Sequence, residues 1–286
     1  MLELLVAYGL LPEARPQRVD LPPLPDLDAA GPPAVLALAS ARPRSGQTSL
    51  TMGLALAWSL AGRRVLVADL DLAEPLARLL QLGASVDGAA EHTLLHALTS
   101  GRTVEPRNTL LPNVDLVVAG NQGSLDGDAI AHLLRRKPAS LRAALAGAVG
   151  AYDRVLLDCP LAPATLTDAG LAVADHVVAV LPCDAIATPS PLWAKLRREG
   201  APPVVGIALT RWKPGSGPDA AWLQEVYGGA RSVYFDTVIP ELAALHDAWD
   251  VVAGTAGPAL DEAFFAIAQQ IDDRLDHREL ATEAVQ

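Results

Sequence analysis

The chain has 286 residues, 51% of them hydrophobic, and a formal net charge of −11 at pH 7. This hydrophobic content excludes global disorder, and the negative charge argues against a general affinity for nucleic acid or anionic membranes, while leaving room for a local basic patch. Two cysteines, Cys159 and Cys183, are too few for a disulfide scaffold and suit a reducing, cytoplasmic location. No apolar run reaches the roughly 18 residues of a membrane span, so we expect no membrane partner.

The first 33 residues are expected to lie outside the main domain. Residues 1–11 are apolar at helical spacing, and seven prolines follow by residue 33. Proline at this density excludes helix and favours extended backbone. Segment 1–33 is therefore either a disordered extension or an arm that packs on its own domain or on a partner. We expect one α/β domain at residues 34–275 and an acidic tail at 276–286.

Strands and helices alternate along the domain. The strands are continuously hydrophobic, which is typical of strands buried on both faces. This pattern predicts an α/β fold with a mostly parallel sheet covered by helices on both faces. The predicted strands are Val35–Ala39, Arg64–Ala68, Val114–Ala119, Arg154–Leu157, His176–Leu181, Val204–Leu209 and Val233–Val238. The predicted helices are Gln47–Ala61, Pro75–Leu80, His92–Leu98, Leu125–Arg136, Ser140–Val149, Pro191–Arg198, Ala220–Tyr227 and Leu260–Leu275.

The stretch Ala34–Asp71 has the outline of a phosphate-binding βαβ unit. An apolar strand leads into a small-residue loop, a helix follows with Thr48 in its first turn, and a second apolar strand ends in Asp69-Leu70-Asp71. Loops of this kind end in Gly-Lys-Ser/Thr, and the lysine reaches the phosphates. Here Gln47 follows Gly46 in the lysine position. The residues therefore predict the fold of the unit, and the missing lysine puts its phosphate-binding activity in doubt.

Four stretches carry a pattern that extends over most of the chain. They are R-P-R-S-G-Q-T-S at 42–49, R-V-L-V-A-D-L-D-L at 64–72, Y-D-R-V-L-L-D-C-P at 152–160 and V-I-P-E-L-A-A-L-H-D-A at 238–248. In order and spacing they resemble the ParA/MinD group of deviant Walker A (P-loop) ATPases, whose patterns are K-G-G-V-G-K-T-T, R-V-L-L-I-D-x-D-P, Y-D-x-V-I-I-D-C-P-P and V-I-P-R-x-x-x-L-x-E-A. Members of that group position or segregate DNA and other cellular cargo. The resemblance implies their fold from about Val35 to Ile271.

The resemblance also implies ATP and Mg²⁺ as ligands and gives roles to the matching positions. Thr48 and Asp158 match the positions that hold Mg²⁺, and Asp71 matches the acid that orients the attacking water. The alternative for Thr48 is hydrogen bonding at the helix N-terminus, and for both aspartates it is a polar residue at a strand end. The implied nucleotide-binding residues are Arg42, Arg44, Ser45, Gly46, Gln47, Thr48, Ser49 and Thr210.

The departures from the family pattern all weaken phosphate binding. Gln47 replaces the lysine that contacts the phosphates, and Arg42 replaces a signature lysine that reaches across the family's dimer. A charge-assisted hydrogen bond contributes about 1.5–3 kcal/mol, so losing one or two weakens binding on the order of 10–10⁴-fold. Pro43 removes a backbone N–H, and Arg44 brings a side chain to a glycine position. An alternative is that a guanidinium group of Arg42 or Arg44 replaces the missing ammonium.

Three functions are compatible with this chain. The preferred one is a ParA/MinD-like protein of a DNA-segregation or cellular-positioning system, with an impaired nucleotide site, that acts as a homodimeric scaffold or regulator with a protein partner. The second is an active ATP-dependent ATPase that uses arginine for lysine and binds DNA non-specifically. Its candidate DNA contacts are Lys195, Arg197 and Arg198, which solvated helix ends explain equally well. The third is a fold-related small-molecule ligase, for which the chain has no substrate motif.

Overall fold

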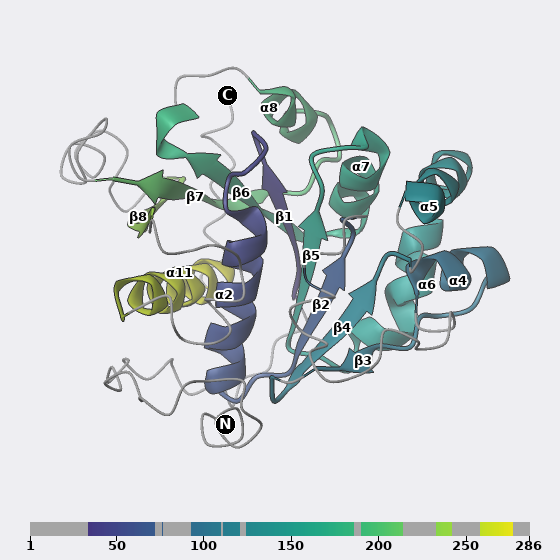
Figure 1. The fold of residues 1–286 in the computed structure, drawn as a ribbon, viewed down its shortest axis with the longest axis horizontal. Helices are drawn as coiled ribbons and strands as arrows, with labels where there is room; N and C mark the ends of the chain where they lie inside the picture. The colour runs from purple at the N-terminus through teal and green to yellow at the C-terminus, as the bar shows by residue number, and fades with distance from the viewer. Residues whose placement is uncertain are drawn as a thin grey trace.

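The computed structural model describes residues 34–71, 76, 93–109, 111–120, 124–185, 190–213, 233–241 and 258–276. These residues form a three-layer α/β unit with a central sheet between two layers of helices (Figure 1). The predicted arm at residues 1–33 and the predicted helix Ala220–Tyr227 lie outside the described residues, as do nearly all of the helix Pro75–Leu80 and of the acidic tail.

Eight strands of the described chain form one sheet in the order β3-β4-β2-β5-β1-β6-β7-β8. Every neighbouring pair is parallel except β3 (Arg107–Asn108), which pairs antiparallel with β4. The predicted mostly parallel α/β sheet is therefore confirmed. The other strands are β1 (Ala34–Ser40), β2 (Val65–Asp69), β4 (Val114–Val118), β5 (Arg154–Cys159), β6 (His176–Pro182), β7 (Val204–Trp212) and β8 (Tyr234–Pro240).

Helices pack on both faces of the sheet, as the continuous hydrophobicity of the strands requires. One face carries α2 (Gln47–Leu60) and α11 (Pro258–Asp276), and their side chains share one core with the sheet, in which Trp58 and Phe264 are the largest buried residues. The other face carries α4 (Leu94–Ser100), α5 (Ser124–Arg136), α6 (Ser140–Val149), α7 (Ala164–Val173) and α8 (Pro191–Leu196) (Figure 1).

One helix was not predicted from the sequence. Helix α7 buries Leu166, Thr167, Ala169, Gly170, Leu171 and Val173. Because threonine, alanine and glycine fill much of the buried side, the helix has little contrast between an apolar and a polar face, and its periodicity is hidden. Gly170 allows a close approach to β5, since a Cβ atom there would lie 2.4 Å from the Cys159 sulfur.

The parallel register brings several chain segments to one edge of the sheet. Strands β1, β2 and β5 are neighbours and end together, so that Ala39 is the partner of Cys159 and Asp69 is the partner of Asp158. Residues 41–46, here called loop 41–46, follow β1 at the same edge. Ligands of open α/β sheets bind at the carboxyl ends of the strands. This edge is therefore the expected position of a ligand-binding site.

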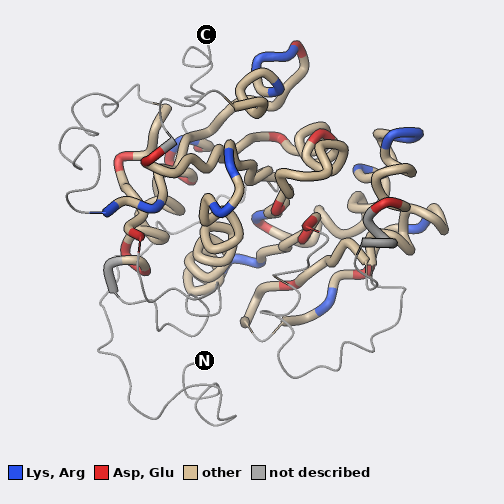
Figure 2. The backbone as a smooth tube through the Cα atoms, turned by 45° about the horizontal axis from the view of Figure 1, so that its top comes forward, with Lys and Arg blue, Asp and Glu red and all other residues tan. Residues whose placement is uncertain are grey.

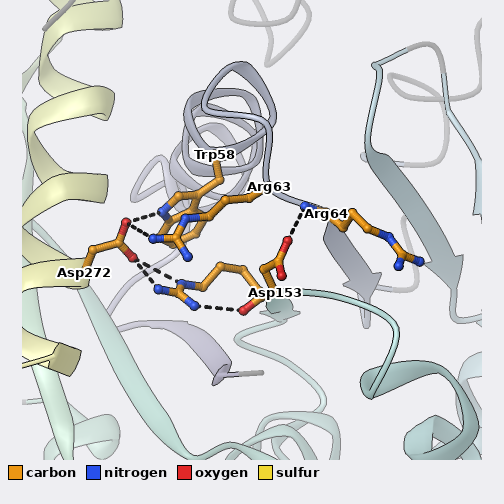
Figure 3. A network of polar contacts seen from close by, with 6 residues as sticks. Trp58, Arg63, Arg64, Asp153 and Asp272 are labelled. Carbon is orange, nitrogen blue, oxygen red and sulfur yellow. Dashed lines mark hydrogen bonds and ion pairs between the residues drawn. The ribbon is translucent and has the colours of Figure 1, made fainter. Parts of the chain in front are cut away.

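At the opposite edge, a buried ion cluster fastens α11 to the rest of the domain (Figure 3). Asp272 Oδ2 accepts hydrogen bonds from Trp58 Nε1 at 3.0 Å and from Arg63 Nη2 at 3.1 Å. Its Oδ1 accepts from Arg154 Nε at 3.1 Å and Nη2 at 2.8 Å. The donors come from the end of α2, from the following turn and from the first residue of β5. Helix α11 is thus bonded to the C-terminal end of α2, which is the helix that follows loop 41–46.

Candidate nucleotide site

Loop 41–46 connects β1 to α2 through two residues in the left-handed region. Gly46 has φ 79° and Arg44 has φ 56°. The conformation is free of steric cost for glycine, whereas an L-residue such as Arg44 incurs roughly 1 kcal/mol. The side chains of Arg42 and Arg44 are exposed, with exposed Pro43 between them. The two arginines that could replace the missing ammonium therefore lie on the surface of the described structure.

The carboxamide of Gln47 is turned towards the end of β5. Its Nε2 donates to Asp158 Oδ1 and to the backbone oxygen of Cys159, the latter at 2.8 Å. A primary amide has two N–H donors, and both are used here. Because the Cys159 carbonyl can only accept, this contact fixes which end of the amide faces β5. The group that remains is the carbonyl oxygen of Gln47, which is an acceptor and has no N–H to offer a phosphate.

Two buried carboxylates lie beside this amide. Asp69 and Asp158 are 0% and 1% exposed and are register partners on β2 and β5. Burial raises the pKa of Asp158 to about 6, although the hydrogen bond from Gln47 opposes the rise. Burial, and next the charge of Asp158, hold the pKa of Asp69 well above its usual range. Neither carboxylate forms an ion pair with a lysine or arginine of the described ranges.

The predicted magnesium residues are brought together. The hydroxyl of Thr48, in the first turn of α2, lies near enough to Asp158 to lower the pKa of that carboxyl, as does the hydroxyl of Thr51. Asp158 Oδ2 is buried and has no hydrogen-bond partner within the described part of the chain. Asp71 follows on from β2, and its backbone N–H donates to Asp69 Oδ1 at 3.0 Å. The Asp158 carboxylate, with its unpaired Oδ2, and the Thr48 hydroxyl are oxygen groups of the kind that bind a hard divalent cation.

Thr210 lies at the edge of loop 41–46, but its hydroxyl is already engaged. Its Oγ1 donates to the backbone oxygen of Ser45 at 2.6 Å, and both residues are buried. Thr210 therefore fastens the loop, and its implied role in nucleotide binding stays a prediction. The sequence did not predict two further contacts of the loop, in which the hydroxyls of Ser40 and Ser190 donate to loop carbonyls. Nothing in the sequence marks them, because a lone serine carries no motif.

Of the three predicted DNA contacts, one forms an ion pair within the chain and two are exposed. Lys195 Nζ lies 2.6 Å from Asp168 Oδ1 and donates to the Ala164 carbonyl at 3.3 Å, so its charge is partly neutralised within the chain. Arg197 and Arg198 follow α8 and are exposed. Figure 2 shows lysines and arginines spread over several parts of the described chain, with acidic residues among them.

Comparison with known proteins identifies the family. The family model described as "Cellulose biosynthesis protein BcsQ" matches residues 34–215, which is more than half of the chain. An uncharacterized protein of Mycobacterium tuberculosis strain H37Rv is 27% identical over 281 residues, covering 91% of this chain and 85% of that protein.

Solved structures at lower identity share the fold. The septum site-determining protein MinD of Pyrococcus horikoshii, complexed with Mg-ADP, is 20% identical and has a TM-score of 0.65, covering 86% of this chain and 98% of that one. Cobyrinic acid a,c-diamide synthase of Mycobacterium smegmatis, with bound ADP and magnesium, is 21% identical with a TM-score of 0.66 over 88% and 99%. A putative plasmid partition protein of Borrelia burgdorferi bound to AMPPNP is 15% identical with a TM-score of 0.66 over 86% and 99%. The chain belongs to the BcsQ family and has the ParA/MinD-type P-loop ATPase fold.

Proposed function

We propose that this chain is a ParA/MinD-like scaffold or regulator of a cellular-positioning or DNA-segregation system, and that its nucleotide site is impaired. The observation that carries the proposal is the carboxamide of Gln47, which spends both N–H groups on Asp158 and Cys159. At the position where the family has a cation for the phosphates, this chain presents a neutral acceptor oxygen. Turning the amide towards a phosphate would break both hydrogen bonds in a buried site.

The residues present fit one half of a Mg·ATP complex and do not fit the other. Thr48 and Asp158 are suited to hold a magnesium ion, which in this fold neutralises phosphate charge. The phosphate half lacks its cation, and the buried carboxylates of Asp69 and Asp158 lie at the same sheet edge. Wherever these carboxyls are ionised, no lysine or arginine of the described ranges pairs with them, and their negative charge repels a triphosphate. We therefore derive no hydrolytic step for this chain.

A scaffold needs a surface for its partner, and the same edge of the sheet offers one. Leu161 is 43% exposed and lies two residues after β5, which is the direct neighbour of β1. Exposed Arg42, Pro43 and Arg44 follow β1. Arginine is enriched in protein interfaces, and the buried centre of an interface is apolar. We propose that this edge forms the contact of a homodimer that assembles without nucleotide.

Two classes of partner follow from the comparisons. The family description names cellulose biosynthesis, so a polysaccharide-synthesising assembly is the first class to test. A septum site-determining protein and a putative plasmid partition protein share the fold. Gel-shift on plain duplex DNA at two salt concentrations separates a DNA-bound role from a protein-only role, because phosphate contacts weaken steeply with salt.

Isothermal titration with Mg·ATP tests the impaired site. The wild type should show no binding at micromolar nucleotide. Gln47→Lys should gain roughly 10- to 10²-fold, from one charge-assisted hydrogen bond. The triple variant Pro43→Gly/Arg44→Gly/Gln47→Lys should gain more, because it also restores a backbone N–H and removes a side chain from the loop. Adding Thr48→Ala to the triple variant is the matched control and should lower the magnesium-dependent part of the gain.

The competing functions predict other results. Micromolar binding and turnover by the wild type would overturn the proposal. If Arg42→Ala or Arg44→Ala then abolished that binding, arginine would be serving as the missing lysine and the chain would be an active ATPase. Turnover that appears only with a small carboxylic acid would favour the ligase, whose fold is shared by the cobyrinic acid a,c-diamide synthase.

A further inference from the structure

Loop 41–46 is held by hydroxyl groups that come from three other parts of the chain. Ser190, just before α8, donates to the Ala41 carbonyl at 3.1 Å. Ser40, at the end of β1, donates to the Arg42 carbonyl at 3.0 Å. Thr210 on β7 donates to the Ser45 carbonyl at 2.6 Å. Three carbonyls along this short loop therefore accept hydrogen bonds from side chains of the same chain.

Backbone contacts complete the fastening at both ends. The Ala41 N–H donates to the Val180 carbonyl of β6 at 3.2 Å, and the Gly46 carbonyl accepts from the Leu50 N–H at 2.9 Å as α2 begins. Gln47 then ties the start of α2 to the end of β5. The loop and the start of α2 are thus joined to β5, β6, β7 and the residue before α8.

We propose that these hydroxyls lock loop 41–46 in one conformation, so that the loop keeps its shape whether or not nucleotide is present. Thr210 is the principal positioning residue, because its hydrogen bond is the shortest of the three hydroxyl contacts and is buried. The exposed side chains from Arg42 to Arg44 are then presented permanently to a partner. This inference rests on the proposed function and adds a mode of regulation to it: partner binding at this edge is constitutive.

The lock also accounts for a strained residue. Arg44 holds φ 56° in a loop where the neighbouring carbonyls are fixed on either side. A left-handed L-residue persists only where its surroundings over-determine it. The hydroxyl contacts supply such a constraint from within the chain.

Hydrogen–deuterium exchange of a peptide covering residues 41–50 tests the lock. In the wild type the two amides of this segment that have backbone acceptors, Ala41 and Leu50, should exchange slowly, and millimolar Mg·ATP should not change their rate. Thr210→Val removes the hydroxyl at nearly constant shape and should speed exchange on the order of 2- to 10-fold, which is the loss of one hydrogen bond. Thr210→Ser keeps the hydroxyl and should restore protection, which a role in packing alone would not predict. Exchange in α11 should stay the same in all variants.

Ser190→Ala is a second variant at a less buried site and should speed exchange in the same direction, so the test does not depend on the folding of Thr210→Val. Rapid exchange of the Ala41 and Leu50 amides in the wild type, or protection of them that appears only with Mg·ATP, would overturn the lock. So would variants that exchange at the wild-type rate.

The lock and the impaired site fail separately. If the wild type binds nucleotide and the loop exchange is unchanged, the proposed function is wrong and the lock is supported. If the wild type binds no ATP and the loop exchanges freely, the lock is wrong and the proposed function is supported.

Discussion

At the scale of single residues, the direction of the Gln47 amide decides what the site can bind. The missing lysine can be read directly from the loop sequence. The partners of the replacement cannot, because Gln47 and Asp158 are 111 positions apart and meet only through the register of β5 beside β1. The same holds for Thr210, which is 165 positions from Ser45. The sequence shows that the lysine is missing, and only the fold shows which groups Gln47 and Thr210 contact.

Gln47→Leu should destabilise the domain by about 2–4 kcal/mol, because it leaves two buried acceptors, Asp158 Oδ1 and the Cys159 carbonyl, without their donor. Urea unfolding followed by circular dichroism measures the change. Gln270→Leu is the matched control, since Gln270 is a partly buried amide on α11, and a smaller loss is expected there. A Gln47→Leu domain as stable as the wild type would show that the amide contacts are not formed.

Asp261 gives the domain a stability that depends on pH. Burial, and next the charge of Glu262, raise its pKa to about 6 from an ordinary value of 3.8. The folded state then binds the proton more tightly than the unfolded state, so stability falls as the pH rises from about 4 to 6. Asp261→Asn should lose less stability than the wild type over that interval, as measured by thermal unfolding at a series of pH values. Asp69 and Asp158 shift in the same direction and are common to both proteins, so the difference isolates Asp261. Parallel pH profiles would refute the assignment.

At the scale of secondary-structure elements, hydrophobic pattern predicted the buried strands well and the small-residue helix poorly. Strands β1, β2 and β6 are continuous apolar runs, and the structure places them within a residue or two of the predicted bounds. Helix α7 hides its buried side behind alanine, threonine and glycine. The short antiparallel β3 has only two residues and therefore no pattern to detect. Elements whose burial is carried by large side chains could be predicted, and those that pack by close approach could not.

One buried carboxylate contributes to the docking of α11, beside the apolar side chains of its buried face. Asp272→Asn removes the charge shared by the guanidinium groups of Arg63 and Arg154, so both cations would be left buried without their anion (Figure 3). Breaking a buried ion pair in this way costs about 3–5 kcal/mol. Urea unfolding measured by tryptophan fluorescence would report the loss, because the indole of Trp58 bonds to the same carboxylate.

Asp273→Asn is the matched control for that cluster, because Asp273 is the next residue of α11 and is exposed. We expect a change within about 0.5 kcal/mol there. Equal effects of the two substitutions would mean that α11 is held by its apolar face alone.

At the scale of the whole molecule, the sheet carries its two polar clusters at opposite edges. The loop, Asp69 and Asp158 lie where the parallel strands end, and the Asp272 cluster lies where β5 begins. Helix α2 runs from the loop towards the opposite end of the sheet on one face (Figure 1), where its Trp58 bonds to Asp272. No helix in the described ranges combines the length and hydrophobicity needed to cross a bilayer. The proposed dimer contact lies at the edge where the parallel strands end.

Light scattering tests assembly at that edge. The wild type should have the mass of a dimer, and Mg·ATP should not change it. Leu161→Asp should shift the mass towards a monomer, because it places a charge in an apolar contact. Leu60→Asp is the control, since Leu60 is 50% exposed but ends α2 at the other edge. A monomeric wild type that dimerises only with Mg·ATP would contradict constitutive assembly.

The most direct test of the impaired site is a crystal structure of the wild type grown with millimolar Mg·ATP. An impaired site predicts no ordered triphosphate against loop 41–46, and Gln47 Nε2 within hydrogen-bonding distance of both Asp158 and the Cys159 carbonyl. A triphosphate held by the loop, with the Gln47 amide turned away from β5 towards a phosphate oxygen, would contradict it.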